Sequence, residues 1–504
     1  MAFLRRATAE GGRRVVGARR AVRRVRMSAT GAADGARVAV SAREGERTTA
    51  RADARADASA RRGSALGPFV VVSLSYVLFT MTDGAVRMLT LMHAHAIGFT
   101  AMEVATTFTL YELCGAGTNL AAGVAGARFG IRGTLVCGLV LQLAGLGTLF
   151  AWDASWSRGR AMAFVTCAQA LCGVAKDLTK LGGKTVTKLV TPDDAQRSLF
   201  KLVSGITGLK NSFKGVGYFI GAAMLGVSYE AALWTQIGLI VVALPFAIFG
   251  LDASLGKVSK KNITLGAVFK QNRNMNVLSL SRVFLFGSRD LWFEVPLPFF
   301  LRSAEGMGWP RSAVGALLAG YIIFYGQLQT WTPQAFLAPL RQNPPNKHAA
   351  VVWNFALVSV PLFLGAFVQS AMFRDHPGET TAKTVVIFIG VFVFAFLFAV
   401  NSAIHSYLVI KYAEGNKVAI NVGYYYMANA FGRLIGTIVS GALYSYVGSA
   451  VEGFAACFWA SSVFVLLSAV IELFLDDNSG GLLCGSIACI DDDATNAHDP
   501  ESAK

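Results

Sequence analysis

The feature that most constrains this fold is a series of apolar segments, each about as long as a membrane is thick. A helix of about 20 mostly apolar residues crosses the roughly 30 Å hydrocarbon layer of a bilayer. Twelve such segments are expected, at 66–93, 101–127, 133–152, 161–182, 198–226, 230–251, 275–302, 311–338, 349–371, 384–411, 417–447 and 451–475. Only 15% of the 504 residues are charged, against about 25% in soluble domains. The sequence therefore predicts an all-α membrane protein.

The longest connection between these segments, residues 252–274, is basic and divides the spans into six and six. We expect an N-terminal six-helix half at 64–251 and a C-terminal half at 275–475. A short internal echo supports two related halves, because Ser73-Leu74-Ser75 opens the first span and Ser279-Leu280-Ser281 opens the seventh. Two facing six-helix halves, with a substrate site near the midplane, are the plan of the major facilitator fold. Basic residues in the short loops place both termini on the inner side of the membrane.

Both ends of the chain lie outside the spans. Residues 1–63 hold sixteen Arg, no Lys and six acidic residues, which favours an organelle transit peptide; a disordered basic tail on anionic lipid is the alternative. Residues 476–504 are acidic and expected to be disordered. The plastid envelope is favoured over the mitochondrial inner membrane and the plasma membrane. Because the basic excess sits in a tail and between spans, nucleic acid is not an expected partner.

Charged side chains inside the spans carry the most information about function. Each one costs roughly 3 kcal/mol to insert at a helix centre, so each needs a partner, water or a role. Seven basic residues lie well inside the spans, against five acidic ones. The basic residues are Arg87, Lys176, Lys210, Lys214, Arg282, Arg289 and Arg433, and the acidic ones are Asp83, Glu112, Asp177, Asp290 and Glu294. The positive excess predicts a small anionic substrate.

The predicted anion site combines cations from both halves. Lys210 and Lys214 lie one turn apart in the fifth span, and ion pairing with an acid such as Glu112 is the alternative. Arg282 and Arg289 share one face of the seventh span, where an Arg can bind a carboxylate or phosphate with two hydrogen bonds. Lys176 and Arg433 are expected to support the site. Lys180, Lys184 and Lys188 follow Lys176 at every fourth position, which indicates a solvated extension for the last two.

Three intramembrane carboxylates are candidates for proton coupling, namely Glu112, Asp83 and Asp290. Glu112 is the best lone candidate, since it lies midway along the second span. The sequence contains no phosphate-binding loop, dinucleotide fingerprint, metal-ligand set or nucleophile elbow. We therefore expect no enzyme activity, cofactor or metal site.

The connection between the second and third spans carries a partial gating motif. Major facilitators have there a Gly, three residues, an Asp, a basic residue, any residue and a Gly. Gly123, Arg128, Gly130 and Arg132 fit this motif, whereas Ala127 stands in the place of the acid. The gate is therefore expected to use a different ion pair.

Several blocks, in order along 66–475, resemble the ArsJ-type organoarsenical efflux permeases of the major facilitator superfamily. They are Thr82-Asp83-Gly84-Ala85-Val86-Arg87-Met88-Leu89, Tyr111-Glu112, Gly173-Val174-Ala175-Lys176-Asp177-Leu178, Pro192-Asp193-Asp194-Ala195-Gln196, Lys210-Asn211-Ser212-Phe213-Lys214-Gly215, Phe286-Gly287-Ser288-Arg289-Asp290-Leu291-Trp292 and Tyr425-Tyr426-Met427-Ala428-Asn429. The resemblance implies export of 1-arseno-3-phosphoglycerate, an ester formed from arsenate by glyceraldehyde-3-phosphate dehydrogenase, and hence arsenate resistance. It also suggests functional coupling to that enzyme; we expect a monomer in the bilayer.

Two other functions remain open. An organelle exchanger of phosphorylated three-carbon acids would need nearly the same binding site. A transporter-like sensor would bind the anion and signal through its tails. Competition between substrates separates the first from the arsenical exporter, and removal of 476–504 separates the second.

Overall fold

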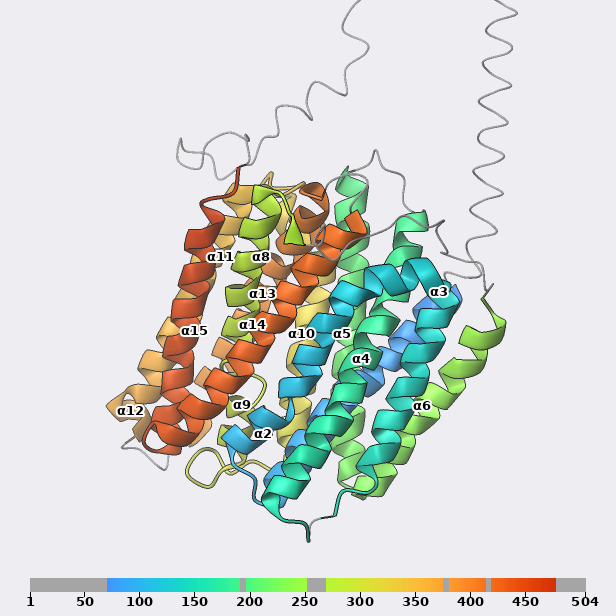
Figure 1. Ribbon diagram of the computed structural model, residues 1–504. Coiled ribbons are helices and arrows are strands. Elements are labelled where there is room, and N and C mark those ends of the chain that lie inside the picture. Colours follow the sequence, from blue (N-terminus) through green and yellow to red (C-terminus); the bar gives the residue numbers. More distant parts are fainter. Residues whose placement is uncertain are drawn as a thin grey trace, which may run out of the picture. The chain divides into compact units, whose positions relative to one another are not determined.

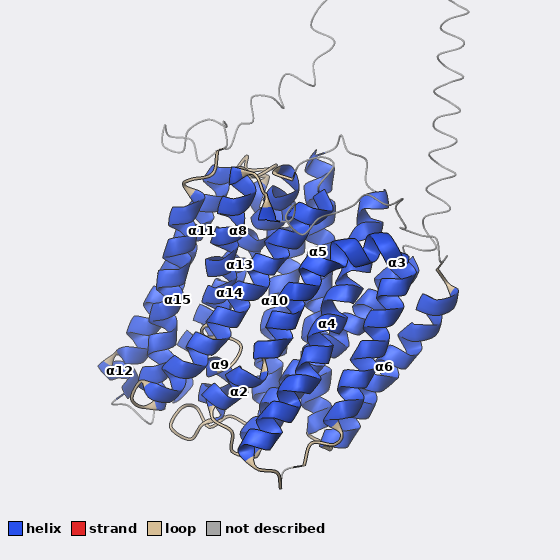
Figure 2. Ribbon diagram, viewed as in Figure 1, coloured by secondary structure: helices blue, strands red, loops and turns tan. Residues whose placement is uncertain are grey.

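The computed structural model describes residues 70–153, 155–190, 196–251, 269–374, 380–413 and 418–476. In this part of the chain the regular elements are all helical, as Figure 2 shows. They are the first helix (Val70–Ala96), α2 (Ala101–Thr107), α3 (Thr109–Leu149), α4 (Arg158–Val190), α5 (Gln196–Leu225), α6 (Tyr229–Phe249), α8 (Arg273–Asp290), α9 (Pro296–Arg302), α10 (Arg311–Trp331), the π-helix η1 (Thr332–Leu337), α11 (Lys347–Gln369), α12 (Ala371–Arg374), α13 (Thr380–Lys411), α14 (Val418–Tyr446) and α15 (Ala450–Glu472). The predicted segment 1–63, residues 252–268 of the central loop and residues 477–504 lie outside the described residues.

The predicted all-α membrane fold is confirmed. Seven described helices are long and apolar enough to cross a membrane, and the remaining long helices are consistent with the other predicted spans. α5 and α14 fall below that apolarity, because α5 carries Lys201, Lys210 and Lys214 and α14 carries Arg433 together with several Asn, Ser and Tyr residues. Large apolar side chains such as Trp234 and Phe249 are 63% and 85% exposed on α6. A lipid environment accounts for such an apolar outer surface.

Two predicted spans are interrupted and two others are joined in one helix, each for a local reason. The span 275–302 divides into α8 and α9, because Pro296 lacks a backbone N–H and begins a new helix. Pro333 similarly lies in the π-helical turn that follows α10. The spans 101–127 and 133–152 share the long helix α3, which is kinked at Gly130 with φ of 75°. Glycine adopts that backbone conformation at no steric cost, which explains the residue in the predicted gating motif.

One side of the bundle collects the ends of elements from both halves. The start of α8 joins the end of α15 through an ion pair of 2.9 Å between Arg273 and Asp476. The rings of Phe200 at the start of α5 and Tyr407 near the end of α13 lie 5.3 Å apart. Gly250 after α6 lies against the start of the first helix. We call this the terminal side; it is at the top of Figure 1.

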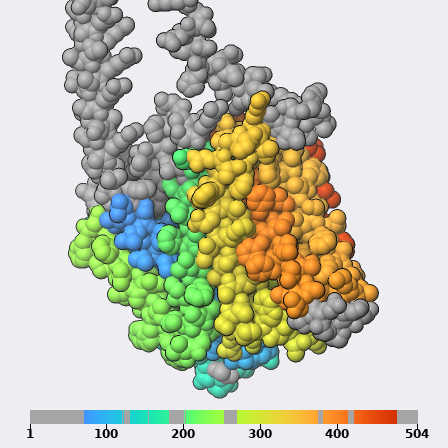
Figure 3. All heavy atoms as spheres, turned by 180° about the vertical axis from the view of Figure 1, so that it is seen from behind, coloured from blue at the N-terminus to red at the C-terminus, as the bar shows by residue number. Residues whose placement is uncertain are grey.

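The two halves contact each other mainly where α5 packs against α10 and where α2 and α3 pack against α14. α5 crosses α10 where Gly208 meets Gly326, and a side chain on either glycine would collide with the backbone of the other helix. Small residues allow such close approach within a membrane. In Figure 3 the surfaces of the α5–α6 and α10 regions, coloured green and yellow, lie side by side. Away from the terminal side, the backbone N–H of Met102 in α2 donates to Ser445 Oγ in α14 at 3.1 Å.

Candidate functional site

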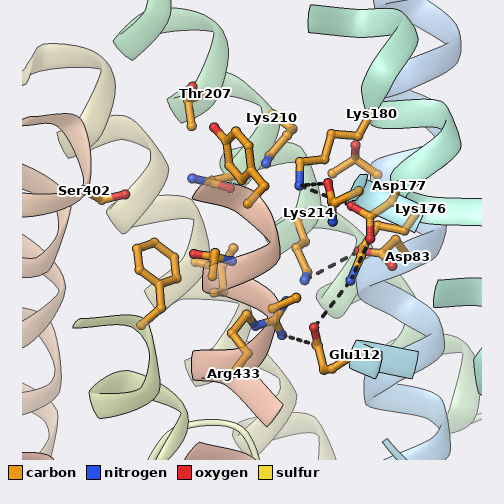
Figure 4. A pocket seen from close by; sticks show the side chains of 18 of the residues that line it. Asp83, Glu112, Lys176, Asp177, Lys180, Thr207, Lys210, Lys214, Ser402 and Arg433 are labelled. Carbon is orange, nitrogen blue, oxygen red and sulfur yellow. Dashed lines mark hydrogen bonds and ion pairs between the residues drawn. The ribbon is translucent and has the colours of Figure 1, made fainter. Parts of the chain in front are cut away.

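A polar cavity lies between the two halves, with an empty volume of about 1050 Å³ that includes its opening to solvent. Helices of both halves line it, and Figure 4 shows the close-up. Its charged lining residues are Asp83, Glu112, Lys176, Asp177, Lys180, Lys210, Lys214, Arg282, Arg289, Glu294 and Arg433. Its polar lining includes Asn119, Thr207, Asn211, Ser402, Ser406, Tyr426 and Asn429. Most of these residues lie in the half of their helix that is nearer the terminal side, so the cavity faces that side.

Lysines of α4 form part of the cavity wall that the N-terminal half contributes, here called the N-terminal wall. Lys176 Nζ lies 3.6 Å from Glu112 and 3.9 Å from Asp177. Lys180 Nζ lies 3.2 Å from Asp177, and it also lies 4.1 Å from the centroid of the Tyr426 ring in the other half. Lys180 thus belongs to the cavity, although its spacing in the sequence also suited a surface extension.

Lysines of α5 form the rest of this wall, and the two differ in their partners. Lys214 Nζ lies 3.6 Å from Asp83, whose other carboxylate oxygen accepts a hydrogen bond from Tyr111. Lys210 lies one turn closer to the terminal side and lines the same cavity. No ion pair or hydrogen bond joins Lys210 to another residue in the described part of the chain, and no dashed line reaches it in Figure 4. The predicted alternative, pairing with Glu112, applies to Lys176 instead.

The C-terminal wall, contributed by the C-terminal half, consists mainly of arginines in ion pairs with carboxylates. Arg289 Nη2 lies 2.5 Å from Asp290 and 3.3 Å from Glu294. Arg433 contacts the same two acids, at 2.9 and 3.1 Å. Asp290 is fully buried behind the wall, so it positions these arginines rather than facing the cavity. The break between α8 and α9 brings Glu294 into this cluster.

Two ion pairs cross between the halves at the closed end of the cavity. Arg87 of the first half contacts Glu294 of the second at 3.3 Å, and Arg433 of the second half contacts Glu112 of the first at 3.1 Å. Arg87 also donates to Glu112 at 2.7 Å. All four side chains are at most 10% exposed. We call these four residues the ionic lattice; they tie the halves together below the cavity.

Arg282 is the exception on the C-terminal wall. Its Nε donates to the neutral amide oxygen of Asn429 at 2.9 Å, and its guanidinium lies 3.5 Å from the centroid of the Phe286 ring. Its Nη1 is buried and has no hydrogen-bond partner. Among the described residues no carboxylate pairs with Arg282. Together with Lys210 it presents cavity charge that the protein does not neutralise.

The structure brings all six predicted substrate-binding residues to this cavity: Lys176, Lys210, Lys214, Arg282, Arg289 and Arg433. The interpretation of Glu112 as a lone carboxylate was wrong, because Arg87, Lys176 and Arg433 surround it. The interpretation failed because the partners of Glu112 lie on other helices, and residue spacing within one helix does not predict such pairs. Of the predicted gating motif, Gly130 forms the kink in α3 and Arg132 is partly exposed. The structure does not describe the surroundings of Gly123 or the side chain of Arg128.

No protein-family model and no curated protein sequence matches the chain. Solved structures do match. An outward-facing bacterial homologue of the iron transporter ferroportin aligns with a TM-score of 0.57 and 15% identity, over 81% of this chain and 98% of that one. A mutant of the nucleoside transporter NupG aligns with a TM-score of 0.56 and 14% identity, over 82% and 100%. The chain therefore has the major facilitator fold, which its sequence predicted.

Proposed function

We propose that this protein is a membrane transporter that binds a small organic anion in the cavity and moves it by alternating access. The observation that carries the proposal is the uncompensated charge of Lys210 and Arg282 on facing walls of the cavity. Eight cations of the cavity and the ionic lattice face four carboxylates there, and Asp290 behind the C-terminal wall is the fifth. A bound anion supplies the missing negative charge, and the fold is one in which substrates bind between the halves.

The contacts suggest how binding leads to movement. Lys210 and Arg282 lie on opposite halves and repel each other while the cavity is empty. An anion held by both removes this repulsion and favours closure of the terminal side. Release on the other side requires the ionic lattice to open, since Arg87–Glu294 and Arg433–Glu112 join the halves there. These two pairs replace the missing acid of the loop motif as the gate.

For the substrate we propose 1-arseno-3-phosphoglycerate, which the resemblance to ArsJ-type permeases implies. Its phosphate and arsenate groups lie at the two ends of a three-carbon chain, which suits cations on two facing walls. Glyceraldehyde-3-phosphate dehydrogenase would supply it, and its export would confer arsenate resistance. The long Ala- and Ser-bearing stretch after Met27 favours the plastid envelope as the membrane, and the protein is proposed to act as a monomer. An exchanger of phosphorylated three-carbon acids is the second candidate, because the same two walls suit those acids.

The test is product release from proteoliposomes. The vesicles are loaded with glyceraldehyde-3-phosphate dehydrogenase, oxidised nicotinamide cofactor and glyceraldehyde-3-phosphate, and they receive arsenate or phosphate in parallel. Release of the phosphorylated product that requires both arsenate and the transporter supports organoarsenical export. Equal release with phosphate, or release of 3-phosphoglycerate itself, favours the general exchanger. No release of any of these anions contradicts the proposed function.

A further inference from the structure

A second cluster of buried titratable groups lies outside the cavity, between helices of the C-terminal half. His405 of α13 and Glu472 of α15 are both fully buried, and His405 Nε2 lies 2.6 Å from Glu472 Oε1. Ser281 donates to the same carboxylate oxygen at 2.8 Å, and Asn354 donates to it at 2.9 Å. Ser468 completes the cluster, with hydrogen bonds to Ser281 and Asn354.

Glu472 differs from the carboxylates of the cavity in its partners. Glu112, Asp83 and Asp290 each lie in an ion pair with a Lys or an Arg. Glu472 has no such pair within the described residues, and its Oε2 is buried without a hydrogen-bond partner. A buried carboxylate without a cation is costly in a low-dielectric interior. One additional proton, shared between His405 and Glu472, brings the net charge of this pair to zero.

A chain of contacts connects the pair to the cavity. The hydroxyl of Tyr425 lies 3.3 Å from His405 Nδ1, and the Arg282 guanidinium lies 5.1 Å from the centroid of the Tyr425 ring. Arg282 lines the cavity and has no carboxylate partner of its own among the described residues. A change in charge around Arg282 is therefore felt at His405 through one intervening side chain.

The other groups packed around the pair are neutral or occupied. α8 contributes Ser281, α11 contributes Asn354 and α15 contributes Ser468; the titratable group from α14 is Tyr425. On the terminal side, Lys347 of α11 donates to the Leu475 carbonyl at 3.0 Å, and Arg273 of α8 pairs with Asp476. Arg282 is thus the cation placed to bias the protonation of the pair from the direction of the cavity.

We propose that the His405–Glu472 pair is a proton-binding site whose occupancy is linked to the anion through Arg282. While the cavity is empty, the charge of Arg282 disfavours the additional proton. A bound anion neutralises Arg282, and the pair then takes one proton from water. By thermodynamic reciprocity the proton also strengthens anion binding, so anion and proton bind together. This inference rests on the proposed function, and it moves proton coupling away from Glu112, Asp83 and Asp290.

The experiment measures proton uptake during anion binding. Purified full-length protein in weakly buffered detergent solution is titrated with 3-phosphoglycerate, while calorimetry follows binding and a pH indicator follows protons. We expect wild type to take up protons as it binds. Glu472→Gln should still bind the anion while losing the protein's share of this uptake, and the pH dependence of its Kd should flatten. Glu305→Gln, which alters an exposed carboxylate of the same half, should behave like wild type.

His405→Gln is the second variant, in case Glu472→Gln does not fold. It retains a hydrogen-bond donor beside Glu472 and removes the imidazole, and it should lose proton uptake in the same way. Anion binding by wild type without proton uptake, or uptake that persists in both folded variants, would overturn the proton site and leave the proposed function intact. Absence of 3-phosphoglycerate binding in wild type would instead contradict the proposed phosphoester site, because this probe shares the phosphate and the three-carbon chain of the proposed substrate.

Discussion

Both walls of the cavity carry cations, but the cations of the two walls differ in their carboxylate partners. Carboxylates contact the lysines of the N-terminal wall at 3.2–3.9 Å, and Lys210 has no such contact within the described residues. On the C-terminal wall Arg289 and Arg433 contact Asp290 and Glu294 at 2.5–3.3 Å. The planar fork of Arg suits several carboxylate contacts at once, whereas the ammonium group of Lys is a flexible point charge. The comparison suggests that the arginines hold the protein together and that the lysines, with Arg282, serve the ligand.

The largest expected effect comes from breaking the arginine wall at Arg433→Gln. This change leaves Glu112, Asp290 and Glu294 short of one cation, and breaking a buried ion pair costs about 3–5 kcal/mol. We expect a marked fall in the melting temperature in detergent and loss of transport. Arg433→Lys keeps the charge without the fork and should recover part of both. Wild-type stability of Arg433→Gln would show that the arginines are not structural.

Lys210→Gln should have the opposite profile. Its ammonium has no ion-pair or hydrogen-bond partner to lose among the described residues, so the melting temperature should stay unchanged or rise. A hydrogen bond to a charged group contributes about 1.5–3 kcal/mol, which corresponds to roughly a tenfold to hundredfold weaker Kd for 3-phosphoglycerate. Calorimetric binding and thermal unfolding of the same sample check both parts. A destabilised variant with unchanged affinity would place Lys210 among the structural cations.

A double-mutant cycle on Lys214 and Asp83 sharpens the comparison within the lysine wall. The two groups are 3.6 Å apart; Lys214 is partly exposed to the cavity, whereas Asp83 is buried. We expect a coupling free energy of about 1 kcal/mol or less. Asp83→Asn alone should strengthen anion binding a few-fold, because it frees Lys214 for the ligand. Weaker binding by Asp83→Asn would indicate that Asp83 positions Lys214 instead.

The smallest effect is expected from Lys180→Gln. Lys180 has both Asp177 and the Tyr426 ring as partners, so it contributes mainly general positive charge. We expect at most a few-fold loss of affinity, and a smaller loss in added salt, because ions that enter the open cavity screen the charge of Lys180. Titrations at two ionic strengths measure this. A loss as large as that of Lys210→Gln would extend the ligand site to Lys180 on α4.

The sequence predicted the fold and the charged residues of the cavity, but not which of these residues pair with one another. Apolar segment lengths were sufficient for the spans, because a bilayer leaves helices as the simplest solution. Charged residues within the spans identified the cavity residues, because a charge inside a membrane is costly without a partner, water or a role. The pairing of Arg433 with Glu112 in the other half depends on helix packing that local spacing does not encode. Glu472 received no role from the sequence, because its partner His405 lies 67 residues away.

The most direct test of this account is 3-phosphoglycerate binding to the double variant Lys210→Gln/Arg282→Gln. These two cations lack carboxylate partners in the described part of the chain, and they face each other across the halves. The matched control is Lys201→Gln/Arg311→Gln, which removes the same charges from exposed positions. The account predicts that the control binds like wild type and that the double variant loses binding without losing its fold. Equal affinity of the double variant and wild type would contradict the account.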